Sequence, residues 1–181
     1  QNLFSRVPLP QENIHYVNGV AADFEKYKQT IADLGGADIV MLGSGMDGHL
    51  AFNEPPKYSA FTSRMQEVDL DGSTIIANKP DYPEIERNPH AYTMGMADIF
   101  RGKNLFFLAK GAKKAEIVKK SLEGPITEQV PASMLQKHPK VTVILDTGAA
   151  SLLTSDTEKA EEEMIGEVYK RYKKARWRTE S

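Results

Sequence analysis

The chain has 181 residues, of which 40% are hydrophobic, 27% charged and 8% aromatic; this composition suits one globular domain and excludes bulk disorder. Its net charge of −2 predicts no nucleic-acid or membrane-surface partner. The absence of cysteine excludes a disulfide scaffold and a thiolate metal site. No apolar run approaches the roughly 20 residues that span a bilayer, so we expect no membrane partner and a cytoplasmic location.

The hydrophobic pattern predicts alternating helices and strands. Apolar residues at spacings of three and four predict an amphipathic helix from Val20 to Leu34, which Gly35-Gly36 ends. Continuous apolar runs predict buried strands at residues 38–43, 104–109 and 141–145. Further helical segments are expected at residues 96–100, 111–122 and 131–135, with a long C-terminal helix around residues 164–172.

The middle of the chain is harder to interpret. Residues 73–77 fit a strand, and the polar segment 79–89, with three prolines, is typical of a loop. The strands alternate with helices and are continuously apolar, which predicts a single α/β domain over residues 1–181 with parallel strands covered on both faces.

The glycine-rich segment Gly43-Ser-Gly-Met-Asp-Gly48 follows the first predicted strand and fits the dinucleotide fingerprint G-x-G-x-x-G. That fingerprint requires a helix of several turns after its third glycine. Only six residues separate Gly48 from Pro55, which blocks such a helix. A dinucleotide site is therefore disfavoured.

The polar residues of this loop indicate proton transfer. Asp47, His49 and Glu54 come just after the strand, where ligands of α/β sheets bind. An imidazole between two carboxylates suits acid/base work near neutral pH. A metal site on the same three residues is a weaker alternative, because no second histidine stands at ligand spacing. Individually, the three residues also fit a turn cap, a packed histidine and a solvated carboxylate.

The segment Leu-Gly-Ser-Gly-Met-Asp-Gly-His-Leu-Ala-Phe-Asn-Glu-Pro at residues 42–55 resembles the signature loop of glucosamine-6-phosphate deaminases. The sister 6-phosphogluconolactonases share a Gly-x-Asp-Gly-His start but lack the Ala-Phe-Asn-Glu-Pro found here at residues 51–55. Residues 108–115 and 130–139 are similar to the deaminases in the same order, and the resemblance covers residues 10–150. It implies a Rossmann-like three-layer α/β fold of the sugar-phosphate isomerase/deaminase type.

The resemblance also implies the chemistry. His49 would be the acid/base that opens the pyranose ring of glucosamine 6-phosphate, assisted by Asp47 and Glu54. A separate aspartate base would then shift a proton between C1 and C2, releasing ammonia and fructose 6-phosphate without a cofactor or a metal. Substrate contacts are implied at Gly43, Gly45, Ala51 and Lys114.

Lys114 would hold the substrate phosphate. It follows Gly111 at a predicted helix N-terminus, where free N–H groups and the helix dipole favour an anion. Lys113 beside it is more consistent with a solvated surface lysine.

The chain also departs from the family pattern. Asn78-Lys79-Pro80 replaces the usual Asn-Ser-Arg, whose arginine binds phosphate, and Lys79 or Arg87 would have to substitute. Arg64 matches an arginine of an allosteric site, but a neighbouring lysine of that site is Gln66 here, so allosteric activation is not assumed. The alternatives are galactosamine 6-phosphate as substrate or a non-catalytic sugar-phosphate-binding homologue, and a homo-oligomer is left open.

Three observations predict that the chain is N-terminally incomplete. It begins without Met and has only three clear strands, whereas sheets of this class usually have about five or six. Neither a phosphate loop after a first strand nor the family's aspartate base is recognised in the sequence. We therefore expect the N-terminal strands of the fold to lie outside this sequence. The basic segment 170–178 is interpreted as cations near a helix C-terminus rather than as a nucleic-acid patch.

Overall fold

The computed structural model describes residues 7–17, 19–154, 161–165 and 168–174, and the chain divides into two compact units, Gln1–Gly36 and Ala37–Ser181. The first unit contains a 3₁₀ turn, η2 (Gln11–Asn13), and helix α1 (Ala21–Asp33), on which Phe24 is buried. Gly35 and Gly36 follow the helix with positive φ angles of 77° and 93°. The predicted helix and its glycine stop are confirmed, because glycine adopts this left-handed conformation without a Cβ clash.

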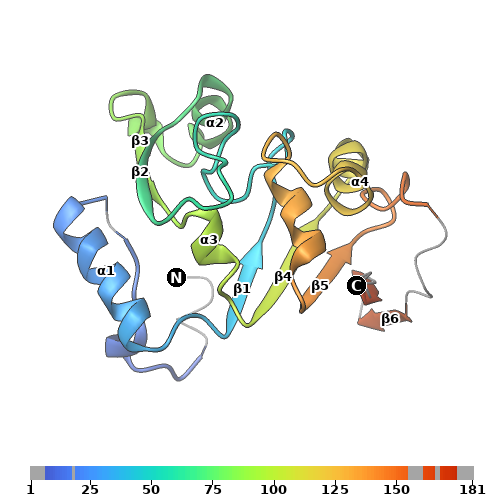
Figure 1. Cartoon of the computed structure of the whole chain (residues 1–181), viewed down its shortest axis with the longest axis horizontal. Coiled ribbons are helices and arrows are strands. Elements are labelled where there is room, and N and C mark those ends of the chain that lie inside the picture. Colours follow the sequence, from blue (N-terminus) through green and yellow to red (C-terminus); the bar gives the residue numbers. More distant parts are fainter. Residues whose placement is uncertain (1–6, 18, 155–160, 166–167, 175–181) are drawn as a thin grey trace. The chain divides into compact units, whose positions relative to one another are not determined.

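The second unit is built on a five-stranded sheet with the order β1-β4-β5-β7-β6 (Figure 1). Strands β1 (Ile39–Leu42), β4 (Asn104–Ala109) and β5 (Val141–Leu145) are parallel. Strand β7 (Val168–Lys174) pairs antiparallel with both β5 and β6 (Glu161–Ile165). The predicted α/β class with a mostly parallel sheet is confirmed, and β4 and β5 have the predicted bounds.

The predicted C-terminal helix is wrong. Residues 161–165 and 168–174 form paired strands, with Ile165 opposite Val168. The valine and the two tyrosines of β7 are residue types that favour strands, and a short apolar pattern fits either period. Residues 170–174 belong to β7, so their interpretation as the C-terminus of a helix is also wrong. Residues 175–181 lie outside the described part of the chain.

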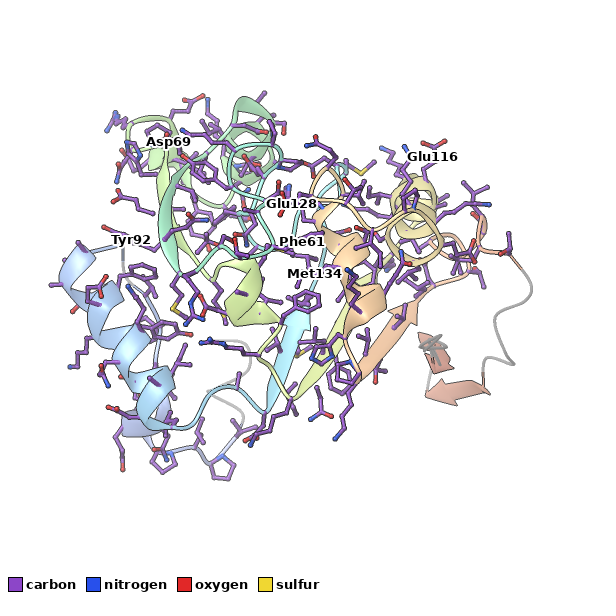
Figure 2. All side chains as sticks on the ribbon, viewed as in Figure 1. Phe61, Asp69, Tyr92, Glu116, Glu128 and Met134 are labelled. Atoms are coloured by element: carbon purple, nitrogen blue, oxygen red, sulfur yellow. The ribbon has the colours of Figure 1, made fainter. Side chains whose placement is uncertain are left out.

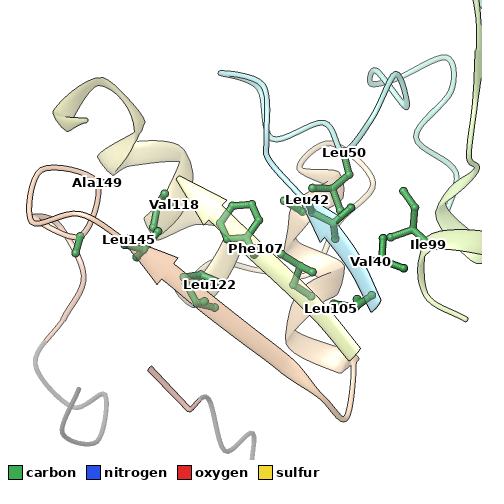
Figure 3. Close-up of a cluster of buried hydrophobic side chains, with 14 of the residues drawn as sticks. Val40, Leu42, Leu50, Ile99, Leu105, Phe107, Val118, Leu122, Leu145 and Ala149 are labelled. Carbon is green, nitrogen blue, oxygen red and sulfur yellow. The ribbon is translucent and has the colours of Figure 1, made fainter. Parts of the chain in front are cut away.

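Helices cover one face of the sheet: α3 (Met96–Ile99), α4 (Ala115–Glu123), which follows the 3₁₀ turn η4 (Ala112–Lys114), and the 3₁₀ helix η5 (Pro131–Lys137). Figure 3 shows the apolar side chains that meet there. The buried strand residues alternate along the chain, so they share this face. They are Val40, Leu42, Leu105, Phe107, Val143 and Leu145.

The opposite face of the sheet carries the intervening residues. On β1 these are Ile39 and Met41, whose exposed fractions are 60% and 71%. Coverage of this face by a second helical layer, as expected for a three-layer fold, is not seen among the described residues of this unit.

A smaller antiparallel pair, β2 (Gln66–Asp69) and β3 (His90–Thr93), stands apart from the main sheet (Figure 1). The sequence did not reveal these strands, because three of the four residues in β2 are polar or charged. Between them lie α2 (Gly72–Asn78) and the 3₁₀ turn η3 (Pro83–Glu86).

Helix α2 corrects the strand expected at residues 73–77. The carboxylate of Asp71 accepts the backbone N–H of Thr74 at 2.8 Å and so caps the helix. Thr74, Ile75 and Ile76 are β-branched and favour strands, but the cap supplies a local hydrogen bond that a strand would not make.

In the described part of the chain, no helix is both long enough and apolar enough to cross a bilayer.

Candidate active site

The glycine-rich loop leaves the carboxyl end of β1 and folds back on itself. Its turn is closed by two backbone hydrogen bonds, Gly45 N–H to His49 O at 3.1 Å and Gly48 N–H to Gly45 O at 3.3 Å. The carbonyl of Gly48 accepts the N–H of Ala132 at the start of η5, at 2.8 Å. Gly48 has φ +88°, and a Cβ there would lie 2.8 Å from Val130 Cγ1. These contacts fix the shape of the glycine-rich loop and hold it against α4 and the start of η5.

His49 and Asp47 form the centre of this loop. The ring nitrogen His49 Nδ1 lies 2.8 Å from Asp47 Oδ1, and the same carboxylate oxygen accepts the His49 backbone N–H at 3.1 Å. The Nδ1 contact is a close charge interaction rather than an aligned hydrogen bond, because Nδ1 is buried without hydrogen-bond geometry to any acceptor. The carboxylate lies against the ring on its Nδ1 side. Among the described residues, Nε2 has no hydrogen-bond or ion-pair partner, so it is the ring nitrogen left free for a ligand.

Gly45 makes this arrangement sterically feasible. A Cβ added to Gly45 would overlap His49 Cε1 and Nδ1 and would come within 2.7 Å of Asp47 Oδ1. The imidazole thus packs directly on the glycine backbone. Gly45 therefore has a packing role, whereas the resemblance implied only a substrate contact for it.

Glu54 has a different environment from the one expected. Its side chain is buried, with 6% of the residue exposed, and it is held by helix α2. Thr74 Oγ1 donates a short hydrogen bond to Glu54 Oε1, and the Asp71 N–H donates to Oε2 at 3.2 Å. Within the described ranges, no hydrogen bond or ion pair joins Glu54 to His49. The structure therefore brings Asp47 against the imidazole and places Glu54 at the start of α2.

Lys114 reaches the glycine-rich loop from η4. Its ammonium group donates to the carbonyl oxygen of Ser44 at 2.7 Å and is partly buried. Gly111, which precedes η4, has φ +89° and donates its N–H to both oxygens of Asp146, each at 2.9 Å. The predicted cation therefore lies beside the predicted proton-transfer loop, since both follow neighbouring parallel strands.

Asp146 is a residue that the sequence reasoning missed. It follows β5 and accepts the backbone N–H groups of Ala149, at 2.8 Å, and Gly111. These two hydrogen bonds, in that order, lower the pKa of its carboxyl group, and Lys110 adds a smaller attraction. Its place directly after a buried strand is the signal that would have revealed it.

Two further loop residues carry structural roles. Ala51 has φ +53°, a left-handed conformation that is uncommon for a residue with a Cβ and that concentrates at functional sites. Asn53 is fully buried and donates its amide to the carbonyl oxygens of Leu50 and Met94, at 2.8 and 2.7 Å. These two hydrogen bonds hold the loop against the residues just before α3, a role that the sequence did not reveal. Gly43 is exposed at the end of β1.

A neighbouring loop contact joins two segments that the sequence did not connect. The N–H of Phe61 donates to Glu128 Oε1 at 2.8 Å, and Figure 2 shows the two residues next to each other. This bond fastens the segment after Glu54 to the segment that precedes η5.

The cations proposed to replace the family's arginine are engaged elsewhere. Lys79 pairs with Glu86 at 2.7 Å and Arg87 with Glu84 at 2.8 Å, all on the exposed surface around η3. Arg64 lies 2.9 Å from Asp98 of α3. In the described part of the chain, neither Lys79 nor Arg87 makes a hydrogen bond or ion pair with the glycine-rich loop.

In the described ranges, no group of three or more His, Asp or Glu side chains is arranged to hold a metal ion.

The fold and the site define an α/β protein with an Asp–His pair and a lysine in the loops that follow neighbouring parallel strands. The sequence profile of the family "Glucosamine-6-phosphate isomerases/6-phosphogluconolactonase" matches residues 1–144. The chain belongs to this family.

Named relatives in the family are similar over most of the chain. A glucosamine-6-phosphate deaminase of Thermoanaerobacter pseudethanolicus is 38% identical over 169 residues, covering 91% of this chain and 66% of the relative. A glucosamine-6-phosphate deaminase of Lachnoclostridium phytofermentans is 43% identical over 149 residues, covering 80% and 62%. The chain thus spans slightly less than two thirds of the length of these relatives.

Solved structures agree with this placement. A monomeric glucosamine-6-phosphate deaminase is 42% identical with a TM-score of 0.66, covering 76% of this chain and 56% of that one. A 6-phosphogluconolactonase of Trypanosoma brucei, at 22% identity and a TM-score of 0.56 over 76% and 57%, shares the fold alone.

Proposed function

We propose that the protein to which this chain belongs is a glucosamine-6-phosphate deaminase that converts glucosamine 6-phosphate to fructose 6-phosphate and ammonia. The observation that carries the proposal is the Asp47–His49 pair, with Nδ1 2.8 Å from the carboxylate, in a loop that continues with the deaminase-like segment 51–55. The relatives near 40% identity are named deaminases, which favours this activity over lactone hydrolysis.

The geometry supports ring opening by His49. Opening a cyclic hemiacetal requires removal of the proton from the anomeric hydroxyl and delivery of a proton to the ring oxygen. One imidazole can do both, because a ring nitrogen can accept a proton and then donate it. Asp47 lies 2.8 Å from Nδ1 and faces the positive charge that the ring carries between the two transfers, and Nε2 is proposed to exchange the proton with the sugar.

Lys114 supplies the cation for the phosphate of the substrate. Its ammonium lies at the glycine-rich loop, with one hydrogen bond to Ser44 O and further donors to offer to a phosphate oxygen. Gly43 is exposed at the end of β1 and has no side chain, so a sugar can approach its backbone. We propose no cofactor and no metal for the reaction.

The remaining step needs a second base. After ring opening, a proton moves from C2 to C1, and water hydrolyses the resulting C2 imine to the ketone and ammonia. We assign the proton shift to none of the described residues. Residues 1–181 are proposed to form one α/β domain of the enzyme, a hydrolase of amino-sugar catabolism in the cytoplasm.

A second candidate substrate is galactosamine 6-phosphate. Asn78-Lys79-Pro80 departs from the family's phosphate-binding pattern, and Lys79 is paired with Glu86. Ammonia release by the full-length protein, measured with both amino-sugar phosphates, tests the proposal. Faster release from glucosamine 6-phosphate supports it. Faster release from galactosamine 6-phosphate changes the substrate, and binding of both without release indicates a sugar-phosphate sensor.

A further inference from the structure

In the described part of the chain, Lys114 forms no ion pair with a carboxylate. Its ammonium group is partly buried and donates to a neutral acceptor, the carbonyl oxygen of Ser44, at 2.7 Å. Four other lysines do form ion pairs with carboxylates: Lys28, Lys57, Lys79 and Lys103. A partly buried cation without a counter-ion favours an anionic ligand. This unbalanced cation touches the same loop that holds the Asp47–His49 pair.

Asp146 joins the loop after β5 to the start of η4. Both of its carboxylate oxygens accept the N–H of Gly111, each at 2.9 Å, although the two residues are 35 positions apart. Gly148 packs on the same place, because a Cβ added to it would lie 2.9 Å from the backbone nitrogen of Ala112 and 3.3 Å from the carbonyl carbon of Gly111. The loop after β5 therefore holds the start of η4 through a side chain and through its backbone.

The turn held in this way carries Lys114. Gly111 has φ +89°, and its carbonyl oxygen accepts the backbone N–H of Lys114 at 3.0 Å, which closes the turn. A lysine side chain is a flexible stem, so the place of its ammonium group depends on where its backbone is anchored. A continuous series of hydrogen bonds thus leads from Asp146 through Gly111 and Lys114 to Ser44 in the glycine-rich loop.

The bond to Gly111 is additional to those that close the turn after β5. Within that turn, the Asp146 carboxylate accepts the N–H of Ala149 at 2.8 Å, and the Asp146 carbonyl oxygen accepts the N–H of Ala150 at 3.1 Å. These local bonds define the turn on their own. What the long-range bond adds is a fixed position for η4, and with it for Lys114.

We propose that Asp146 is a positioning residue: by holding Gly111 it keeps the ammonium group of Lys114 beside the glycine-rich loop, where it binds the phosphate of the substrate. This inference rests on the function proposed above. It predicts that loss of the Asp146 carboxylate raises KM more than it lowers kcat, because a phosphate contact remote from the reacting atoms contributes equally to substrate and transition-state binding.

The test is a double-mutant cycle in the full-length protein with Asp146→Asn, Lys114→Ala and the double variant. Asp146→Asn alone is expected to raise KM for the sugar phosphate by about three- to tenfold, the range for one weakened hydrogen bond, with kcat within about twofold of wild type. Because Asp146 acts through Lys114, adding Asp146→Asn to Lys114→Ala is expected to change KM by less than about twofold.

Asp98→Asn is the matched control. Asp98 also accepts a backbone N–H, that of Met65 at 2.5 Å, but within the described ranges its side chain makes no hydrogen bond or ion pair with η4 or the glycine-rich loop. This control should keep the wild-type KM. Gly148→Ala is a second variant at the same contact, because its Cβ would press on Ala112; it is expected to raise KM as Asp146→Asn does, and it decides the matter if Asp146→Asn does not fold.

Two results would overturn the inference. One is a folded Asp146→Asn variant with the KM of wild type. The other is a double variant whose KM is raised by the product of the two single effects, since Asp146 would then act independently of Lys114. Calorimetric titration with inorganic phosphate separates this inference from the proposed function. If wild type releases no ammonia, that function fails, and phosphate binding that is equally strong in wild type and Asp146→Asn would overturn the role of Asp146 as well.

Discussion

Lys114 and Ser44, 70 residues apart, are joined by a hydrogen bond of 2.7 Å from the lysine ammonium to the serine carbonyl. The bond connects the loop after β4 with the loop after β1, which are neighbouring parallel strands. The proposed phosphate cation and the Asp47–His49 pair therefore belong to one constellation. Each half of it can be tested by itself.

Lys114→Ala is expected to raise KM for the phosphorylated sugar by about ten- to a hundredfold, with a smaller effect on kcat. A charge-assisted hydrogen bond of about 1.5–3 kcal/mol is lost from substrate and transition state alike. Lys113→Ala, at the exposed neighbouring position, is the control and should keep the wild-type KM. If both variants have the wild-type KM, Lys114 does not bind the substrate phosphate and is an ordinary surface lysine.

His49→Gln is expected to lower kcat by about 10²–10⁴-fold, the range for loss of one general acid/base group. Steady-state ammonia release measures the change, and circular dichroism checks the fold. His15→Gln, in the first unit, should leave kcat unchanged. A His49→Gln variant with wild-type turnover on the cyclic sugar would contradict the ring-opening assignment.

The Gly45→Ala substitution tests whether the position of the His49 imidazole affects kcat independently of the stability of the fold. The added Cβ would overlap the imidazole of His49 and approach Asp47 Oδ1. Since a side chain rotates more easily than backbone moves, we expect the ring to be displaced, lowering kcat strongly with a small change in the free energy of unfolding. Urea unfolding and ammonia release on the same sample measure both quantities. Normal kcat would show that the imidazole position is not critical.

The carboxylates of Asp71 and Asp146 are expected to make the stability of the fold sensitive to acid. Hydrogen bonds from backbone N–H groups are the largest cause of the lowered pKa of each carboxyl group, which lies below its ordinary value of 3.8. A group with a lower pKa in the folded state stabilises the protein above its unfolded pKa. That contribution is lost as the pH falls below about 4 and through the lower folded value.

Urea unfolding of wild type and Asp146→Asn as a function of pH measures this effect. The difference in unfolding free energy between the two proteins should be largest near neutral pH and shrink as the pH falls below about 4. A difference that is independent of pH would show that the ionised form of Asp146 contributes nothing.

The sequence predicted the buried parallel strands of the fold well, but not the smaller strand pair or helix α2. Strands β4 and β5 were located at their observed bounds because continuous apolar runs mark strands buried in a parallel sheet. Strand β2 was missed, because Gln66-Glu-Val-Asp69 is mostly polar. Helix α2 was taken for a strand, because its stability depends on the Asp71 cap rather than on its β-branched residues.

In the candidate site, too, local contacts were predictable and long-range contacts were not. Asp47 and His49 were predicted together because they share one short loop, and their contact needs no long-range information. The partners of Glu54 were not predictable, since Asp71 and Thr74 stand 17 and 20 residues further along the chain. Their approach depends on where the β2–β3 unit folds, which local patterns do not specify.

The most direct test of the account is the stoichiometry of products from glucosamine 6-phosphate, with 6-phosphogluconolactone as the competing substrate. The full-length protein is expected to release ammonia and fructose 6-phosphate in equal amounts, and to hydrolyse the lactone no faster than buffer does. Lactone hydrolysis without ammonia release would contradict the account, since the Asp47–His49 loop would then serve hydrolysis of an ester rather than opening of an amino-sugar ring.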